Sequence, residues 1–427
     1  MIWRTRSPPP DVVSRYLLIL AGGSLPERPL LAGCLARSSV HDASTTMHDA
    51  GGCGRRTGDI SSSRVRREPV QAGEEDQMRS MQFDEYGAPL KAFSYEDPTP
   101  QGKEVVVRIE ACGVCHSDIH LHEGYFDMGG GNKADVTRAR ELPFTLGHEI
   151  VGEVVATGPG VTGAKPGDKR IVYPWIGCGD CPKCNSGEDQ SCARPRNLGV
   201  HVDGGYSTHV KIPDEKFLFA YDGIPTELAG TYACSGITAY GALMKAKEGA
   251  ERGGFIGLIG AGGVGMAGLM LAKAAIGAKT VVFDIDDAKL EAATRAGADY
   301  VFNSGAKETR KEVMKLTGGG LSGAVDFVGS DKSALFGINA LGQNGVLVII
   351  GLFGGAMTVP VPLFPLKGIT VRGSYVGSLQ EMSDMMALVR AGKVPPMPVK
   401  TRPLDAAWET LEDLRHGKIV GRVVLTP

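Results

Sequence analysis

The segment from Phe255 to Asp284 constrains the fold more than any other part of this chain. A short apolar run, Phe255–Ile259, is typical of a buried parallel strand and leads into GAGGVG, which has the G-x-G-x-x-G spacing. A helix-like run to about Ile276 follows, and then a second apolar strand, Thr280–Phe283, which ends in Asp284. A strand, a glycine-rich turn, a helix and a second strand in this order predict a dinucleotide-binding unit.

Each glycine of this turn has a physical task. We expect Gly260 to make the tight turn, Gly262 to let the backbone approach a pyrophosphate, and Gly265 to allow close packing of helix on strand. The helix N-terminus then faces the phosphates with its free N–H groups and its positive dipole end. The predicted cofactor-binding residues of the turn are Gly260, Gly262, Gly263, Val264 and Gly265.

Asp284 lies 24 residues after Gly260, where an acid is expected to bind the adenosine ribose. Its carboxylate would accept hydrogen bonds from the ribose hydroxyls and repel a 2′-phosphate, so NAD is favoured over NADP. A glycine-rich turn in another kind of α/β protein is the alternative. Further apolar runs near residues 300–302, 324–328, 346–350 and 369–372 alternate with helical stretches. They predict a doubly wound parallel sheet of about six strands, an α/β fold.

Four of the nine cysteines lie between Cys178 and Cys192, with the spacing C-x2-C-x2-C-x7-C. A disulfide cluster, an iron–sulfur site and a structural zinc site compete as explanations. The apolar stretch YLLILAG at 16–22 has no convincing cleavage site after it, so we expect a reducing compartment, the cytoplasm. There, clustered cysteines are more often metal ligands than disulfides. An iron–sulfur site would more often end in C-x3-C-P, which is missing here.

Length and charge limit the kinds of partner. The chain has 427 residues, 42% of them hydrophobic and 22% charged, which is enough for two domains with a large core. A net charge of −2 argues against nucleic acid or an anionic membrane as the main partner. The sequence has no run of about 20 apolar residues, so we expect no membrane-spanning helix.

Residues 1–80 differ in composition from the rest of the chain. They contain eleven arginines and no lysine, are rich in Ser, Pro and Gly, and show no sustained period. We interpret them as a disordered or mis-annotated leader, with Met78 or Met81 as the real start; an organelle-targeting peptide is the alternative. Cys34 and Cys53 lie in this leader, and we assign neither a role. From Met81 onward the sequence predicts a strand, a turn and a second strand.

Three segments before the dinucleotide unit carry the remaining unusual residues. They are EACGVCHSDIHLHEG (110–124), PFTLGHEIVGEV (143–154) and YACSGITAYGAL (232–243). A catalytic zinc needs about three ligands of Cys, His or carboxylate type and one open position. Cys115, His148 and Cys234 supply such a set, although spacing alone does not establish it, and His148 by itself is equally well an ordinary polar histidine.

The order of these motifs resembles that of the zinc-dependent alcohol dehydrogenases, in the medium-chain dehydrogenase/reductase superfamily. GVCHSD, LGHEIVGEV, G-x2-V-x5-GD (158–168), the four-cysteine loop and G-x-G-x-x-G follow one another, and the resemblance covers about Met81 to Pro427. It implies a GroES-like, mainly β catalytic domain from residues 81–235 and 374–427, around a Rossmann domain at 236–373. It also implies interconversion of an alcohol and its aldehyde or ketone with NAD, in a homodimer or homotetramer.

The resemblance implies two zinc ions in each chain. The ligands of the catalytic zinc match Cys115, His148 and Cys234. The ligands of the structural zinc match Cys178, Cys181, Cys184 and Cys192, and four thiolates close a tetrahedral shell that leaves no room for substrate.

The resemblance also assigns the residues around the catalytic zinc. Ser117 matches the residue that hydrogen-bonds the alcohol hydroxyl, and His120 matches the histidine that ends the proton relay. Asp118 matches the carboxylate that orients the zinc-bound histidine, and Glu149 matches a glutamate that can approach the metal. Two further positions match contacts to the NAD ribose and to the pyrophosphate, and these are Lys289 and Arg422.

Some features depart from the family pattern. The interval from Cys115 to His148 is about ten residues longer than we expect, which leaves the alcohol unspecified. Cys112 and His122 have no family role, and His116 matches a position often near the cofactor phosphates. Two other functions remain as alternatives: a zinc-free quinone or enoyl reductase of the same superfamily, and a non-catalytic NAD-binding protein.

Overall fold

The first strand begins slightly before the predicted start of the folded chain. The computed structural model describes residues 77–419 and 421–427, and β1 (Met78–Phe83) opens the fold. The Arg79 backbone N–H donates to Thr208 Oγ1 at 2.9 Å, and Ser80 is fully buried. Residues 78–80 therefore belong to the fold, and the predicted leader boundary at residue 80 is corrected. The rest of the leader prediction, with Cys34 and Cys53, lies outside the described residues.

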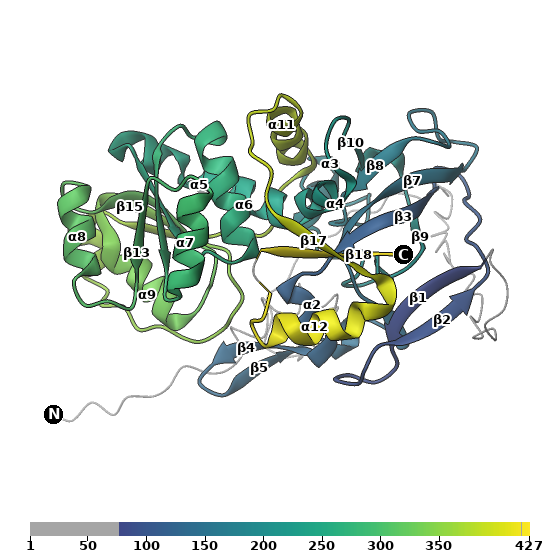
Figure 1. Ribbon diagram of the computed structural model, residues 1–427, viewed down its shortest axis with the longest axis horizontal. Coiled ribbons are helices and arrows are strands. Elements are labelled where there is room, and N and C mark those ends of the chain that lie inside the picture. Colours follow the sequence, from purple (N-terminus) through teal and green to yellow (C-terminus); the bar gives the residue numbers. More distant parts are fainter. Residues whose placement is uncertain (1–76, 420) are drawn as a thin grey trace, which may run out of the picture.

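A six-stranded parallel sheet forms the nucleotide-binding domain, drawn in green in Figure 1. Its strand order is β13-β12-β11-β14-β15-β16. The order reverses between β11 and β14, and ligands of such sheets bind at the carboxyl ends of the strands at this point. The predicted doubly wound fold is thus confirmed. The strands are β11 (Phe255–Ile259), β12 (Lys279–Asp284), β13 (Tyr300–Asn303), β14 (Leu321–Asp326), β15 (Leu341–Ile349) and β16 (Thr370–Gly373).

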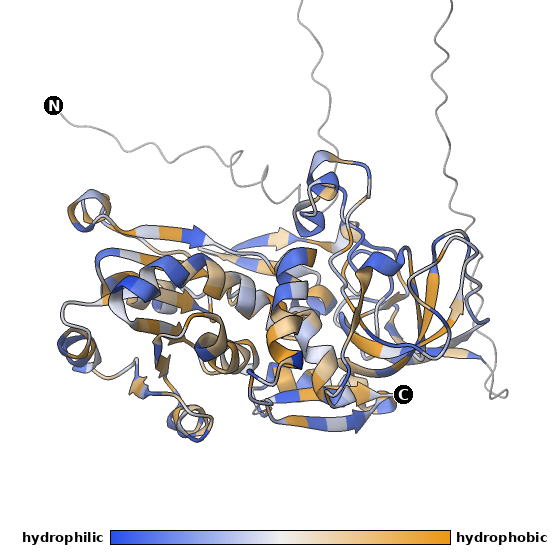
Figure 2. Ribbon diagram, turned by 90° about the horizontal axis from the view of Figure 1, so that it is seen from above, coloured by the Kyte–Doolittle hydropathy of each residue, from blue (hydrophilic) through white to orange (hydrophobic). Residues whose placement is uncertain are grey.

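Helices with one apolar face pack against this sheet. In Figure 2 they carry both hydrophobic and hydrophilic residues, as expected for helices with one buried face. In α7, for example, Leu290 and Ala293 are buried, and the helix contacts β12 and β13. The helices of this domain are α5 (Ser235–Gly253), α6 (Gly263–Ala275), α7 (Asp287–Arg295), α8 (Thr309–Leu316), α9 (Asp331–Ala340) and α10 (Leu363–Lys367).

The catalytic domain is built from both ends of the folded chain. Its main sheet has the order β10-β8-β7-β3-β18-β17, with β9 also paired to β3. The C-terminal strand β18 pairs with β3, and Figure 1 shows these yellow and blue strands side by side. The strands are β3 (Val105–Gly113), β7 (Glu149–Thr157), β8 (Lys169–Val172), β9 (His209–Ile212), β10 (Leu218–Ala220), β17 (Val399–Pro403) and β18 (Arg422–Thr426).

Smaller elements complete this domain. A second sheet has the order β2-β1-β6, and the long interval after Cys115 contains a two-stranded hairpin. These strands are β2 (Lys91–Tyr95), β6 (Phe144–Thr145), β4 (Tyr125–Gly129) and β5 (Asn132–Asp135). The helices are α2 (His116–Glu123), α3 (Pro182–Asn185), α4 (Thr226–Ala229), α11 (Leu379–Arg390) and α12 (Ala407–Arg415). Among the described helices, none is long and apolar enough to cross a membrane.

Candidate active site

Helix α2 presents several of the predicted site residues from its first two turns. Cys115 is the N-cap, and its backbone N–H donates to Asp118 Oδ2 at 3.0 Å, which closes a capping box. The helix ends at Gly124, whose φ of 81° gives a left-handed C-cap. Capping at both ends fixes an eight-residue helix, and thereby fixes Cys115, Ser117, Asp118 and His120 relative to one another.

Cys115, His148 and Cys234 meet although they come from distant parts of the chain. Their ligand atoms all lie within 4.8 Å of one another, and the Cys115 and Cys234 sulfurs are 4.0 Å apart. All three side chains are buried, and the contact with Cys234 lowers the pKa of Cys115 well below its usual value. His148 Nδ1 lies 3.1 Å from Asp118 Oδ1, and both ring nitrogens are buried without a hydrogen bond among the described residues. Two sulfurs and an imidazole nitrogen without a hydrogen-bond partner fit the ligand set of a tetrahedral zinc with one open position.

Glu149 follows His148 and lies in a buried polar network. Its carboxylate accepts a hydrogen bond from Ser235 Oγ at 2.7 Å and pairs with the Arg422 guanidinium. Burial raises the pKa of Glu149, and the positive charge of Arg422 opposes this shift. Arg422 also reaches the nucleotide-binding domain, because a Cβ placed on Gly263 would lie 2.7 Å from Arg422 Cδ. One arginine thus connects the cysteine–histidine cluster to the glycine-rich turn.

Ser117 and His120 lie on the same helix, and both are half-buried. Ser117 Oγ is 3.7 Å from Cys115 Sγ, so the hydroxyl lies beside the candidate metal site. His120 Nε2 is buried with no partner among the described residues. Burial, together with the nearby His116, lowers the pKa of His120 from 6.5 to about 4. The His120 imidazole is therefore neutral near pH 7.

The hairpin β4–β5 covers this part of α2 and reaches the other domain. The Phe126 ring lies 5.0 Å from that of His120. A Cβ on Gly129 would lie 2.5 Å from the backbone N of Ala356, so the two backbones are in close contact. In the same loop of the nucleotide-binding domain, Phe353 stacks on His116 at 4.8 Å. The long interval after Cys115 is therefore an ordered interdomain contact rather than a free surface loop.

The glycine-rich turn has the geometry that its sequence predicts. Gly260 has φ +95°, and a Cβ on Gly265 would lie 1.8 Å from the Gly260 carbonyl oxygen, so both positions require glycine. A Cβ on Gly262 would meet no atom within 4 Å, which leaves open space at the helix N-terminus. Val264 lies half-buried in the first turn of α6.

Asp284 lies at the carboxyl end of β12, next to this turn. Its Oδ2 accepts a hydrogen bond from the Ala261 N–H at 2.8 Å, and its Oδ1 accepts one from the Ile285 N–H at 2.8 Å. The Ile285 side chain is 77% exposed, an unusual position for an isoleucine. Lys289 lies half-buried in the first turn of the following helix, α7.

Cys178, Cys181, Cys184 and Cys192 form a second cluster away from the first. Their sulfurs all lie within 4.8 Å, with Cys181–Cys184 at 3.5 Å, Cys181–Cys192 at 3.7 Å and Cys178–Cys184 at 4.0 Å. All seven described cysteines are free, so this cluster holds no disulfide. Zn–S bonds of about 2.3 Å give a tetrahedron with edges of about 3.8 Å, which agrees with these distances. A 4Fe–4S cluster needs more widely spaced thiolates, because each of its four cysteines binds a different iron.

The structure reveals neighbours of the site that the sequence motifs did not indicate. Ser235 donates to Glu149, and its position directly after Cys234 was the available signal. The Trp175 ring lies 5.4 Å from that of His148, and the Tyr375 ring lies 5.6 Å from Trp175. The Tyr206 hydroxyl donates to Asp118 Oδ2 at 2.9 Å. Cys112 is a buried core thiol, and burial raises its pKa well above the usual value.

Comparison with known proteins gives consistent matches over the described part of the chain. Residues 101–222 match the model of the alcohol dehydrogenase GroES-like domain, and residues 263–391 match that of the zinc-binding dehydrogenases. The chain is 38% identical to an NAD-dependent alcohol dehydrogenase of Sulfurisphaera tokodaii and 37% identical to one of Saccharolobus solfataricus. Each match spans 82% of this chain and 100% of the relative. The crystal structure of an alcohol dehydrogenase from Aeropyrum pernix matches with a TM-score of 0.74 and 32% identity, over 82% of this chain and 100% of that one.

Proposed function

The chain belongs to the zinc-dependent alcohol dehydrogenases of the medium-chain dehydrogenase/reductase superfamily, and from this premise we propose how its residues perform the reaction. It is an enzyme that interconverts an alcohol and its aldehyde or ketone by hydride transfer with NAD. The observation that carries the assignment of the site is the contact chain from the Cys115–His148–Cys234 cluster through Glu149 and Arg422 to the glycine-rich turn.

Cys115, His148 and Cys234 would hold the catalytic zinc and leave its fourth position open for the alcohol. Zinc supplies Lewis acidity there, which lowers the pKa of the alcohol hydroxyl. Asp118 keeps the His148 imidazole oriented, since Nδ1 faces the carboxylate and Nε2 remains for the metal. The buried Trp175 ring lies beside His148 and helps to exclude water from this side of the site.

Ser117 and His120 would move the proton that the alcohol loses. Ser117 Oγ lies next to a metal ligand, where it can accept a hydrogen bond from the substrate hydroxyl. The neutral imidazole of His120 is one helical turn further along α2, and because its pKa is about 4 it would pass a proton on rather than hold it near pH 7. Bound NAD would supply the acceptor for the hydride that the alcohol carbon loses.

The glycine-rich turn and its neighbours would bind NAD. The open space over Gly262 and the free N–H groups of α6 suit the pyrophosphate, and the Arg422 guanidinium adds positive charge there. Asp284 would accept hydrogen bonds from the ribose hydroxyls, with Lys289 as a second ribose contact. The exposed Ile285 side chain offers an apolar face for the adenine ring.

The four-cysteine cluster would hold a second, structural zinc. The sulfur–sulfur distances suit a closed tetrahedral shell, which leaves no site for substrate. We therefore propose two zinc ions per chain. Because all described cysteines are free, we also propose that the enzyme works in a reducing compartment, the cytoplasm.

The edge strand β16 offers a surface for a second copy of this chain. It is the last strand of the parallel sheet, so within residues 77–419 and 421–427 one of its edges is unpaired. Val361 and Leu366, just before it in sequence, are 77% and 75% exposed. Two copies related by a two-fold axis could pair these edges and cover the apolar side chains. We propose a homodimer formed in this way, or a homotetramer built from such dimers; Leu366→Glu should reduce the mass measured by light scattering.

A screen of alcohols tests the proposed function. Primary, secondary and aromatic alcohols are offered with NAD and with NADP, and reduced coenzyme is followed by its absorbance. NAD-linked oxidation of at least one alcohol is expected. A zinc-free reductase would instead reduce quinones or enoyl compounds and lack the ligand set seen here, and a non-catalytic protein would bind NAD without turnover. Either result would reject the proposal.

A further inference from the structure

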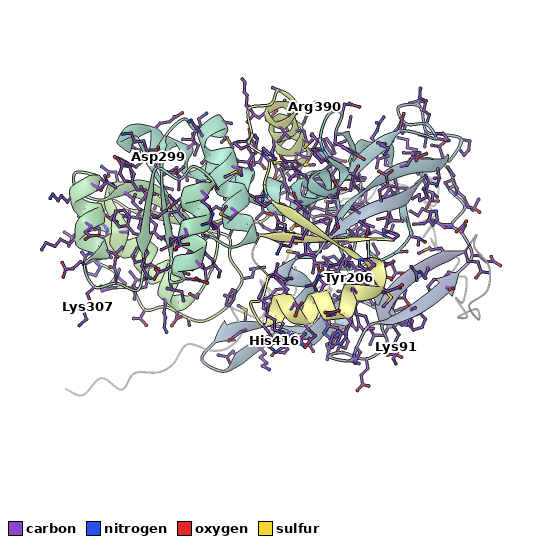
Figure 3. The ribbon with its side chains drawn as sticks, in the orientation of Figure 1. Lys91, Tyr206, Asp299, Lys307, Arg390 and His416 are labelled. Atoms are coloured by element: carbon purple, nitrogen blue, oxygen red, sulfur yellow. The ribbon has the colours of Figure 1, made fainter. Side chains whose placement is uncertain are left out.

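Tyr206 is a fully buried tyrosine that neither motif nor spacing singled out. It lies inside the catalytic domain (Figure 3), where its backbone N–H donates to the Leu146 carbonyl at 2.9 Å. Its ring fills the place that a side chain on Gly147 would need, because a Cβ there would lie 2.5 Å from Tyr206 Cδ1. Gly147 has φ +92° and directly precedes His148. The tyrosine ring therefore supports the backbone that carries a metal ligand.

The hydroxyl of Tyr206 binds the carboxylate that connects two of the three ligands. It donates to Asp118 Oδ2 at 2.9 Å, and the same oxygen accepts the Cys115 N–H at 3.0 Å. The other oxygen, Oδ1, faces His148 Nδ1 at 3.1 Å. Asp118 is fully buried, so water does not replace a donor that is lost.

We propose that Tyr206 is a positioning residue for the catalytic metal site. By holding the Asp118 carboxylate in one orientation, it keeps Cys115 and His148 in place to bind the metal together. The inference rests on the proposed function, because it assumes a metal at Cys115, His148 and Cys234. Partners of metal ligands change metal affinity by about 10- to 100-fold when they are removed. Tyr206 acts one contact further out, so we expect an effect at the lower end of this range.

The test measures the release of zinc from Tyr206→Phe. Phenylalanine keeps the ring packing and removes only the hydroxyl, so the variant should fold. Zinc is followed as it passes to a coloured chelator, in the absence of substrate. We expect the zinc at Cys115, His148 and Cys234 to be the one released first, and it should leave Tyr206→Phe about tenfold faster than it leaves the parent. The zinc held by the four cysteines should be released at the parent rate. With cobalt in the catalytic site, the visible absorption bands should shift, since the ligand geometry changes.

Tyr173→Phe is the matched control. Tyr173 is also fully buried, and its hydroxyl donates to the Gly377 carbonyl at 2.6 Å, not to Asp118. Tyr173→Phe also loses a buried hydrogen bond, to a neutral carbonyl rather than a carboxylate, so its melting temperature should fall while zinc release stays at the parent rate.

A double-mutant cycle separates positioning through Asp118 from a general loss of stability. In an Asp118→Ala background, where no side-chain oxygen is left to accept the tyrosine hydroxyl, Tyr206→Phe should cause little further acceleration of zinc release. An equal acceleration in both backgrounds would overturn the inference, and so would a Tyr206→Phe variant that retains zinc like the parent. If the parent itself binds only the zinc of the four-cysteine cluster, the proposed function fails as well. A parent with two zinc ions and an inert Tyr206→Phe variant rejects the inference alone.

Discussion

Arg422 and Glu149 form a buried ion pair between the candidate metal site and the coenzyme turn. The two side chains are 5% and 0% exposed, and they join the first residue of β18 to the residue after His148. Arg422 also packs against Gly263 at the start of α6. The C-terminal segment of the chain thus contributes directly to the site between the domains.

Removing one partner of this pair should destabilise the folded protein. Arg422→Met leaves the Glu149 carboxylate buried without its counter-charge, so we expect a loss of about 3–5 kcal/mol in the free energy of unfolding. The double variant Glu149→Gln/Arg422→Met should lose less than the sum of the two single variants, because no uncompensated charge remains. Denaturant unfolding of the parent, the two single variants and the double variant measures these free energies. Strictly additive losses would show that the pair is not energetically coupled.

Gly262 and Gly265 should respond differently to the same substitution. In Gly265→Ala the new Cβ would lie 1.8 Å from the Gly260 carbonyl oxygen, so the variant should lose about 1–3 kcal/mol of stability or more. In Gly262→Ala the Cβ meets nothing within 4 Å, so stability should stay near that of the parent. Its methyl group would, however, occupy the space proposed for the pyrophosphate, and the Kd for NADH, measured by fluorescence titration, should rise about tenfold or more. Unchanged NADH binding would place the coenzyme elsewhere.

Asp284 should determine the choice of coenzyme. A 2′-phosphate would face like charge at this carboxylate, so kcat/KM with NAD should exceed that with NADP at least about tenfold, or ~1.4 kcal/mol. Asp284→Ser should narrow this ratio by raising activity with NADP. Asp286→Ser is the control: Asp286 caps α7 by accepting the Ala288 N–H at 2.9 Å, and serine caps a helix about as well, so the variant should keep both its stability and the NAD preference. Equal use of both coenzymes by the parent would refute the role of Asp284.

His120 should make the coenzyme-free protein sensitive to acid. Its pKa in the folded protein is about 4, below the ordinary value of 6.5, because the imidazole is buried near His116. Between these two pH values the unfolded chain binds a proton that the folded chain does not, so stability is lost as the pH falls through this window. His120→Gln cannot titrate, and its melting temperature should fall less between pH 7 and pH 4 than that of the parent. Parallel falls in the two proteins would contradict the buried, neutral state of His120.

The parts of the fold with a regular period could be read from the sequence. The strand Phe255–Ile259 and the turn at Gly260 agree with the prediction because local pattern and glycine geometry decide both. Strand β15 begins at Leu341, five residues earlier than its apolar run at residue 346, because its first half is the polar, glycine-rich sequence LGQNG. The sequence left Met78 and Met81 open as the start of the fold, because the contact that places residues 78–80 in it, Arg79 with Thr208, joins positions far apart in the sequence.

Some residues of the candidate site could also be predicted from the sequence, and others could not. Cys115, His148 and Cys234 could be predicted because they are residues of metal-ligand type at positions that match the family. In the structure their ligand atoms lie within 4.8 Å of one another. Tyr206 could not be predicted in this way, because its proposed role depends on a hydrogen bond to Asp118, which lies 88 residues earlier in the sequence. The hairpin after Cys115 was visible only as extra length, since no local pattern shows that Gly129 approaches Ala356.

Zinc content measured on the parent, Cys115→Ala and Cys184→Ala tests the central claim most directly. The account predicts two zinc ions in the parent, and one in Cys115→Ala, which should keep its fold and lose alcohol oxidation with NAD. Cys184→Ala should lose the structural ion and show a clearly lower melting temperature, because a structural site contributes folding free energy. A parent with a single zinc ion, or a Cys115→Ala variant that retains both ions and its activity, would contradict the account.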